Sequence, residues 1–272
     1  MALTVNTNVA ALAARGDLGR TQDDLGKSLA RISSGLRVKS SADDAAGMGV
    51  ATNLKAVSRS GEVAMRNTGD GISIIQTAEG ASSEITDILS RMRELAVQAS
   101  SEALDTQERS YINDEFDQLS QEITRISDTT EFNGIKLLNG SDTSLQIQVG
   151  ISSTAQISIA LQDVDSSQLG LSAVTMATAT GAQAAIDSVD SALDTMNTFR
   201  AALGAVQNRL DVSLSAMSNY VENLTAAASR IVDADFAYET AEMTKLQIMQ
   251  SAGIASLSQA RNINQGVISL LG

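Results

Sequence analysis

Apolar residues recur along most of this chain at alternating steps of three and four, the spacing of helices that pack as coiled coils. Three stretches follow the pattern closely, namely residues 78–99, 112–126 and 186–231. A turn at about residues 100–106 separates the first two. Such helices can bury their apolar faces on one another, so the pattern predicts a helical bundle. The apolar positions of the first two stretches are Ala78, Ala81, Ile85, Ile88, Met92, Leu95 and Ala99, then Ile112, Phe116, Leu119, Ile123 and Ile126.

A β-hairpin is predicted between about residues 144 and 161. Apolar residues alternate there with polar or small ones, and this period of two is typical of strands. The connecting residues 150–154 contain Gly, Ser and Thr, which favour a turn. Asn133-Gly134 and Asn139-Gly140 are two further turn signals before the hairpin. The alternating apolar residues are Leu145, Ile147, Val149, Ile157, Ile159 and Leu161.

Residues 9–36 also have apolar residues at helical spacing, but Gly16, Gly19 and Gly26 interrupt the run. A glycine inside a helix costs about 1 kcal/mol relative to alanine. The glycines therefore indicate either a weak helix or the close approach of a second backbone, and the sequence leaves both open.

The polar segment at residues 40–47 breaks the helical pattern and is predicted to be a linker that leads into a helix. Asp43 or Asp44 is placed to cap that helix and to complement its dipole. The alternative is a metal site or acid–base chemistry at the two carboxylates. That alternative is disfavoured because no His and no second carboxylate cluster lies nearby.

The composition excludes several classes of chemistry. The 272 residues include no Cys, His, Trp or Pro, and only four Phe and three Tyr. Without Cys or His, a thiol nucleophile, a Ser-His-Asp triad and a zinc finger are excluded. We expect no enzymatic activity, no metal and no cofactor. Because no proline interrupts the helices, the expected fold class is all-α, an elongated antiparallel helical coiled-coil bundle with a small β-hairpin.

Charge is distributed unevenly along the chain. The formal net charge is −13, which argues against binding to nucleic acid or to an anionic membrane. Residues 1–42 carry six basic and three acidic side chains, residues 228–272 three and four, and residues 43–227 ten and 25. The nearly neutral ends suit the interior of an assembly, and the acidic middle suits its hydrated exterior. No stretch reaches the roughly 18 consecutive apolar residues of a transmembrane helix, and no cleaved secretory signal is recognisable.

At several points the chain resembles bacterial flagellin, and the match extends over nearly its whole length. The N-terminal part carries VNTNVAAL from residue 5, SLARISSGLR from residue 28 and DDAAG from residue 43. RMRELAVQ follows from residue 91, FNG from residue 132, IVDAD from residue 231, QARN from residue 259 and VISLL from residue 267. Asn264 stands where the family often has Pro, so the last helix is expected to run closer to the terminus.

The resemblance implies a subunit of two parts. Residues 1–42 and 228–272 would pair as an inner terminal coiled-coil domain, and residues 43–227 would form a rod domain of three helices with the hairpin. Such a structural subunit self-assembles into the helical flagellar filament, the extracellular propeller of bacterial motility, and is exported without a cleaved signal peptide. A hook–filament junction protein with the same terminal domains is the alternative.

The resemblance also implies partners and site residues. The partners are further copies of the chain, a flagellar export chaperone, the filament cap, hook–filament junction proteins and a host Toll-like receptor. Receptor recognition is expected at Arg91, Leu95 and Glu115, of which Leu95 also belongs to the helix-packing pattern. The expected interface between subunits comprises Leu29, Ile32, Leu36, Ile248, Ile254, Leu257, Val267 and Leu270.

Overall fold

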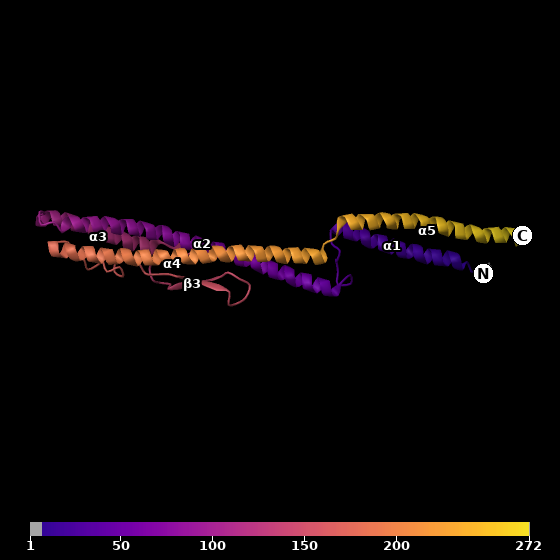
Figure 1. The fold of residues 1–272 in the computed structure, drawn as a ribbon, viewed down its shortest axis with the longest axis horizontal. Coiled ribbons are helices and arrows are strands. Elements are labelled where there is room, and N and C mark those ends of the chain that lie inside the picture. Colours follow the sequence, from indigo (N-terminus) through magenta and orange to yellow (C-terminus); the bar gives the residue numbers. More distant parts are fainter. Residues whose placement is uncertain (1–6, 272) are drawn as a thin grey trace. The chain divides into compact units, whose positions relative to one another are not determined.

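The structure, a computed structural model, describes residues 7–271, and for residues 263–271 it describes the helical backbone without the side chains. Five helices dominate this part of the chain (Figure 1). They are α1 (Val9–Ser34), α2 (Ala45–Ala99), α3 (Thr106–Thr129), α4 (Ala179–Val232) and α5 (Phe236–Leu271). The strands are β1 (Glu131–Phe132), β2 (Ile135–Lys136), β3 (Ser144–Gln148) and β4 (Gln156–Ala160). The predicted all-α class with a small β-hairpin is confirmed.

The chain divides into two compact units. Residues 59–222 form the three-helix unit, and residues 1–58 with 223–272 form the terminal unit. The boundaries of these units fall within α2 and α4, and the expected domain boundaries at residues 42 and 228 stay a prediction. The first turns of α2 pack on the last turns of α4, where the hydroxyl oxygens of Ser58 and Thr225 are 3.2 Å apart. These turns therefore belong to the terminal unit.

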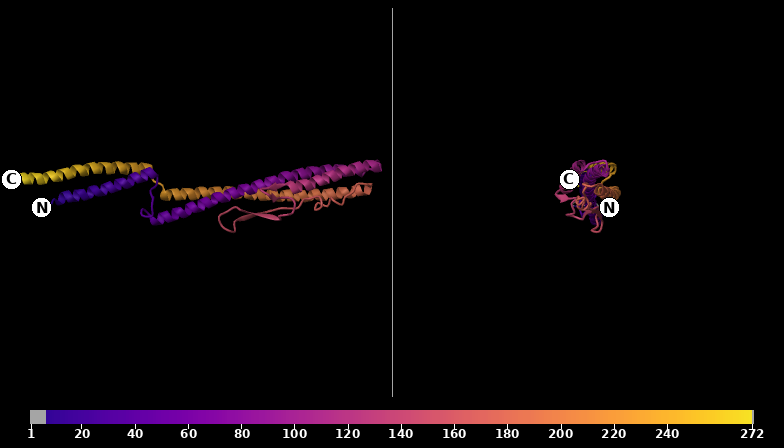
Figure 2. Two further views of the ribbon diagram at one scale, coloured as in Figure 1. Left: turned by 180° about the vertical axis from the view of Figure 1, so that it is seen from behind. Right: turned by 90° about the vertical axis from the view of Figure 1, so that its left-hand side faces the viewer.

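The three-helix unit is built on the apolar pattern of α2, α3 and α4, which lie side by side in Figures 1 and 2. α3 runs back along α2 after a short turn, which is held by the Arg109 guanidinium at the start of α3. The guanidinium donates to the carbonyl of Ala99, the last residue of α2, and to that of Ser101 in the turn. The predicted packing positions of residues 78–99 and 112–126 are buried, except that Ala81, Ile88, Leu119 and Ile126 are partly buried. In the third predicted stretch, Val189, Met196 and Leu210 are buried, whereas Ile186 and Leu193 are partly buried. Fully buried side chains at the centre include Ile85, Met92, Phe116, Ile123, Val189 and Met196.

The predicted hairpin is formed by β3 and β4, which pair antiparallel from Ser144 opposite Ala160 to Gln148 opposite Gln156. Ile159 is fully buried, and Ile157 and Leu161 are nearly so, which places one face of the hairpin in the core. A Cβ atom on Gly71 of α2 would lie 3.2 Å from Ile147 Cγ1, so a glycine at this point allows the hairpin to pack closely on the helix.

A second, smaller hairpin was not predicted. The turn signal at Asn133-Gly134 is confirmed, with φ of 50° and 81°, and these positive values match the tight two-residue turn that joins β1 to β2. Each strand has only two residues, too few for an alternating pattern to show in the sequence. The chain continues into the buried Leu137 and Leu138, and the Ser127 hydroxyl donates to the Leu138 carbonyl at 2.6 Å.

In the terminal unit, α1 and α5 lie side by side (Figures 1 and 2). Asn8 caps α1 through a 2.9 Å bond from the Ala11 amide, and Gly35 ends the helix with a φ of 69°. The segments next to α1 and α5 are joined by a β-bridge between Leu36 and Asp233. α5 continues to Leu271, and no proline interrupts it at Asn264.

The linker before α2 confirms the predicted capping. The Gly47 amide donates to Asp44 Oδ1 at 2.8 Å, which caps the first turn of α2. The Asp43 carboxylate accepts from the amide and hydroxyl of Ser40 and from the Lys39 amide. These bonds, led by the Ser40 amide, lower the pKa of Asp43 below its ordinary value. Among the described residues, no group of three acidic, His or Cys side chains is placed to hold a metal ion.

Gly16, Gly19 and Gly26 do not mark a close approach within the chain. Apart from the glycine, its two chain neighbours and the adjacent backbone of its own helix, no atom of the described chain lies within 4 Å of the point where a Cβ would stand on any of them. Within this chain, therefore, the hypothesis of a second backbone at these positions is wrong.

Candidate functional site

The candidate functional site is the surface of the paired helices α1 and α5. The two helices are antiparallel. Residues later in α1 contact residues earlier in α5, and these contacts define one register of the pair. Near one end of the pair, the side-chain amide of Asn8 donates to the Ala260 carbonyl at 2.8 Å. A Cβ on Gly253 would lie 3.2 Å from Leu18 Cδ1 in the middle.

A polar cluster follows in the same register. Glu239 of α5 is 4% exposed and is the one charged side chain buried among the described residues. Its carboxylate accepts from the hydroxyl of the buried Ser28 at 3.2 Å and from Arg31 Nη1 at 3.3 Å. α1 therefore meets α5 partly through polar contacts.

No apolar residue of α1 is fully buried by this pairing. The residues of α1 that are buried are Thr21 and Ser28, both polar. Val9, Leu12 and Leu29 are 66%, 63% and 48% exposed. α5 has a similar uncovered set, made up of Phe236, Tyr238, Ile248, Met249 and Ile254. One chain thus leaves much of the apolar surface of both helices in contact with solvent.

The structure places the expected interface residues on this surface as far as it describes them. Ile248 and Ile254 are 65% and 55% exposed, and Ile32, Leu36 and Leu257 are half-buried. The side chains of Val267 and Leu270 lie outside the described residues. Phe236, Tyr238 and Met249 are also exposed on this surface and were not among the expected residues, although two aromatic residues at a helix start, in a chain with so few, were an available signal.

The residues expected to contact a receptor lie in the three-helix unit. Arg91 donates to Glu94 at 2.9 Å and to Glu115 at 2.9 and 3.1 Å, and these bonds, led by that of Glu94, raise its pKa. Arg91 and Glu115 are about half exposed. Leu95 is 2% exposed, so in this structure it packs in the core and offers no side chain to a partner.

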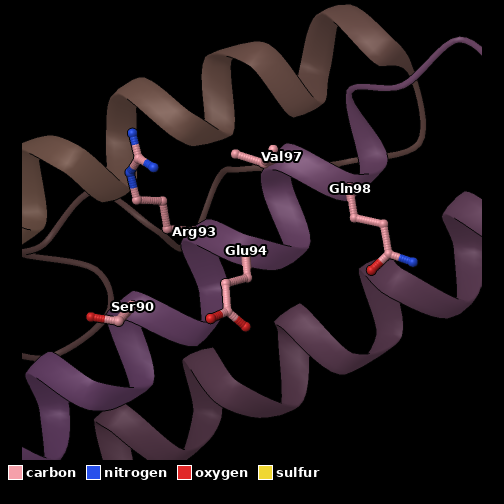
Figure 3. A pocket seen from close by; sticks show the side chains of 5 residues that line it. All are labelled: Ser90, Arg93, Glu94, Val97 and Gln98. Atoms are coloured by element: carbon pink, nitrogen blue, oxygen red, sulfur yellow. The ribbon is translucent and has the colours of Figure 1, made fainter.

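A shallow pocket lies beside this ion pair on the same helix. Figure 3 shows the five side chains of α2 that line it, Ser90, Arg93, Glu94, Val97 and Gln98. Arg93 is held by Asp190 of α4 at 2.6 and 3.2 Å, and the bonds from Arg93 lower the pKa of that carboxyl. The pocket wall is therefore fixed by an ion pair between two helices.

Comparison with known proteins identifies the family. The model of the bacterial flagellin N-terminal helical region matches residues 5–143, and that of the C-terminal helical region matches residues 186–271. The chain belongs to the bacterial flagellin family. A flagellin of Halalkalibacterium halodurans is 43% identical over 271 residues, covering 99% of this chain and 100% of the relative. A flagellin of Bacillus subtilis is 38% identical over 306 residues, covering 99% and 100%.

Solved structures agree with this assignment. The crystal structure of Bacillus cereus flagellin is similar with a TM-score of 0.52 and 30% identity, over 60% of this chain and 94% of that one. A putative flagellar hook-associated protein from Vibrio parahaemolyticus has a TM-score of 0.57 at 13% identity, which shows a shared fold. It covers 66% of this chain and 95% of that one. The family matches favour flagellin over the junction-protein alternative, in the short form without large outer domains. In the described part of this flagellin, no helix is long and apolar enough to cross a membrane.

Proposed function

We propose that this flagellin polymerises through α1 and α5 into the flagellar filament that acts as the propeller of a motile bacterium. The observation that carries the proposal is the exposed apolar surface of the paired helices, on which α1 buries only Thr21 and Ser28. A soluble monomer rarely exposes such a surface without a partner. The partners that cover this surface are further copies of the same chain, since each copy has the same exposed apolar residues on α1 and α5.

Burial of apolar side chains between subunits supplies the free energy that drives polymerisation. A Leu or Ile side chain that becomes fully buried contributes about 1.5–3 kcal/mol. Ile248 and Ile254 are more than half exposed in one subunit and have most of that contribution still available. A repeated head-to-tail contact that does not close on itself produces a fibre.

The charge distribution fits this arrangement. Residues 43–227 carry ten basic and 25 acidic side chains, whereas the two end segments are nearly neutral. Like charges packed at the centre of a polymer would repel one another, while charges on its outside are hydrated and screened by salt. The terminal unit is therefore the inner part of the proposed filament, and the role is structural rather than enzymatic.

The further partners follow from the proposed function. An exported filament subunit needs an export chaperone, and its assembly site is bounded by a cap and by hook–filament junction proteins. Recognition by a host Toll-like receptor stays a prediction that rests on the exposed ion pair of Arg91 and Glu115. A receptor contact with Leu95 would require that residue to leave the core, where it is 2% exposed.

Removal of the last ten residues tests the function. The truncated chain should keep the melting temperature of the three-helix unit, because the core of that unit lies between Ile74 and Leu210. It should fail to elongate filament seeds, because α5 loses part of its contact surface. Seed elongation is followed by light scattering and electron microscopy. Normal elongation by a truncated chain with unchanged melting would refute the proposed role of the termini.

A further inference from the structure

One methionine differs from the others in exposure. Met249 is 47% exposed, and it is the single exposed methionine in the part of the chain whose side chains the structure describes. Met92, Met176 and Met196 are fully buried. The remaining described methionines are half-buried, namely Met48, Met65, Met217 and Met243. Because oxidation of a thioether requires access of the oxidant to sulfur, Met249 is the most accessible target among the described methionines of the folded subunit.

Met249 lies on the surface that the proposed function uses. It lines a groove between α5 and α1, together with Ala252, Gly253 and Ser256 on its own helix and with Ala14, Asp17, Leu18 and Thr21 opposite. The adjacent Ile248 is 65% exposed. A neighbouring subunit that covers the exposed face of α5 would also cover Met249.

We propose that Met249 is an oxidation site at which a peroxide stops the free subunit from assembling. The inference rests on the proposed function, because it requires that α5 is buried between subunits. The thioether sulfur attacks one oxygen of the hydroperoxide, a sulfur–oxygen bond forms and the oxygen–oxygen bond breaks. Sulfur loses two electrons, and the second oxygen leaves as water or alcohol after taking up a proton.

The product has a different effect in the free subunit and in the filament. A sulfoxide is polar and accepts hydrogen bonds, so its burial against apolar side chains is unfavourable unless it finds a donor. In the free subunit, Met249 is open to solvent and the sulfoxide is hydrated at little cost. In a filament the same residue would be covered, which both slows its oxidation and makes the oxidised subunit a poor building block.

The experiment compares the wild type with Met249→Leu and Met249→Gln. Leucine keeps the size and apolar character without a sulfur atom, and glutamine approximates the polarity of the sulfoxide. Free subunits are treated with hydrogen peroxide, oxidation at each methionine is quantified by peptide mass spectrometry, and elongation of untreated seeds is measured. We expect oxidised wild type and untreated Met249→Gln to raise the critical concentration about tenfold, the size expected for one unpaired polar group at an interface. Met249→Leu should elongate normally before and after treatment.

Two further measurements separate the possible outcomes. Methionine sulfoxide reductases should restore elongation of the oxidised wild type, and Met249 in intact filaments should oxidise more slowly than in free subunits. Normal elongation by wild type that is fully oxidised at Met249 would overturn the inference. An equal loss of elongation in Met249→Leu would also overturn it, since the sensitive residue would then lie elsewhere. Failure of the untreated wild type to elongate would instead count against the proposed function.

Discussion

At the scale of single residues, Glu239 stands out because its carboxylate is buried in the contact between α1 and α5. A carboxylate removed from water is costly unless charge and hydrogen bonds compensate for it. Ser28 and Arg31 supply both, at 3.2 and 3.3 Å. A shift of α1 against α5 by one turn would leave Glu239 buried without these partners. The cluster therefore favours one register of the two helices, and with it one arrangement of the exposed apolar face.

Charge reversal at Arg31 and Glu239 tests whether this ion pair sets the register of α1 against α5 or whether the two residues only fill space. Glu239→Arg places a second guanidinium beside Arg31, and Arg31→Glu places a second carboxylate beside Glu239. Glu239→Arg should destabilise the helix pair by about 3–5 kcal/mol because it changes the buried partner, whereas Arg31→Glu should cost less because Arg31 is 37% exposed. The double reversal should recover part of the loss. The measurement is the critical concentration for seed elongation together with the thermal stability of the resulting filaments.

A matched control lies on the same helix. Lys245 and Glu242 form an ion pair that is 62% and 33% exposed, and its reversal should change stability by about 1 kcal/mol or less. An effect at this control as large as that at Arg31 and Glu239 would show that α5 tolerates no charge change at all. The register role of Glu239 would then lose its support.

At the scale of single residues, contacts between neighbours in the sequence could be predicted from the sequence, whereas contacts between residues far apart in the sequence could not. Capping by Asp44 follows from its place just before a helix start, because the bond to the Gly47 amide spans three residues. Nothing distinguished Glu239 from other glutamates along the chain. Its burial depends on which face of α5 meets Ser28 and Arg31, more than 200 residues away in sequence.

At the scale of elements, the hairpin of β3 and β4 depends on the helices beneath it. A two-stranded ribbon alone is only marginally stable in water. Ile159 is fully buried, and Ile147 packs against Gly71 of α2. The alternating pattern was long enough to predict these strands, whereas β1 and β2 have two residues each and only their turn was recognisable.

Alanine substitution in the hairpin tests how strongly it is anchored. Ile159→Ala should lower the free energy of unfolding of the three-helix unit by about 2–4 kcal/mol, because it leaves a cavity in a closed core. Ile151→Ala, at a position 45% exposed in the connecting loop, is the control and should cost well under 1 kcal/mol. Thermal or urea unfolding of the subunit gives both values. A small effect of Ile159→Ala would mean that the hairpin only rests on the helices.

At the scale of the whole molecule, the two units differ in how much core they contain. The apolar cluster from Ile74 to Leu210 lies entirely within the three-helix unit. The buried apolar residues of the terminal unit, in its described part, are Val38, Ala51, Ala228, Val232 and Leu246. Because stability follows the burial of apolar surface, the terminal unit of a free subunit should open far more readily than the three-helix unit.

Limited proteolysis of free subunits should therefore remove both ends. Arg37 and Lys39 lie exposed in the linker between α1 and α2, and Arg230 is exposed two residues before the end of α4. Brief treatment with trypsin should cut first at these positions and leave a fragment of about residues 40–230, which further cutting at the exposed Lys55 would shorten toward the resistant three-helix unit. Trypsin sites inside the three-helix unit, such as Arg93 held by Asp190, should resist because cleavage requires the helix to unfold.

Filaments provide the comparison that decides this prediction. If assembly buries the apolar face of α1 and α5, the ends become as resistant as the rest of the chain, because ordering of the helices is then coupled to burial on neighbouring subunits. Mass spectrometry of the fragments at matched times measures the difference. Equal protection of the ends in free subunits and in filaments would show that the pair α1 and α5 is already stable alone. Subunit contacts would then add nothing to its order, and the coupling between folding of the termini and assembly would be refuted.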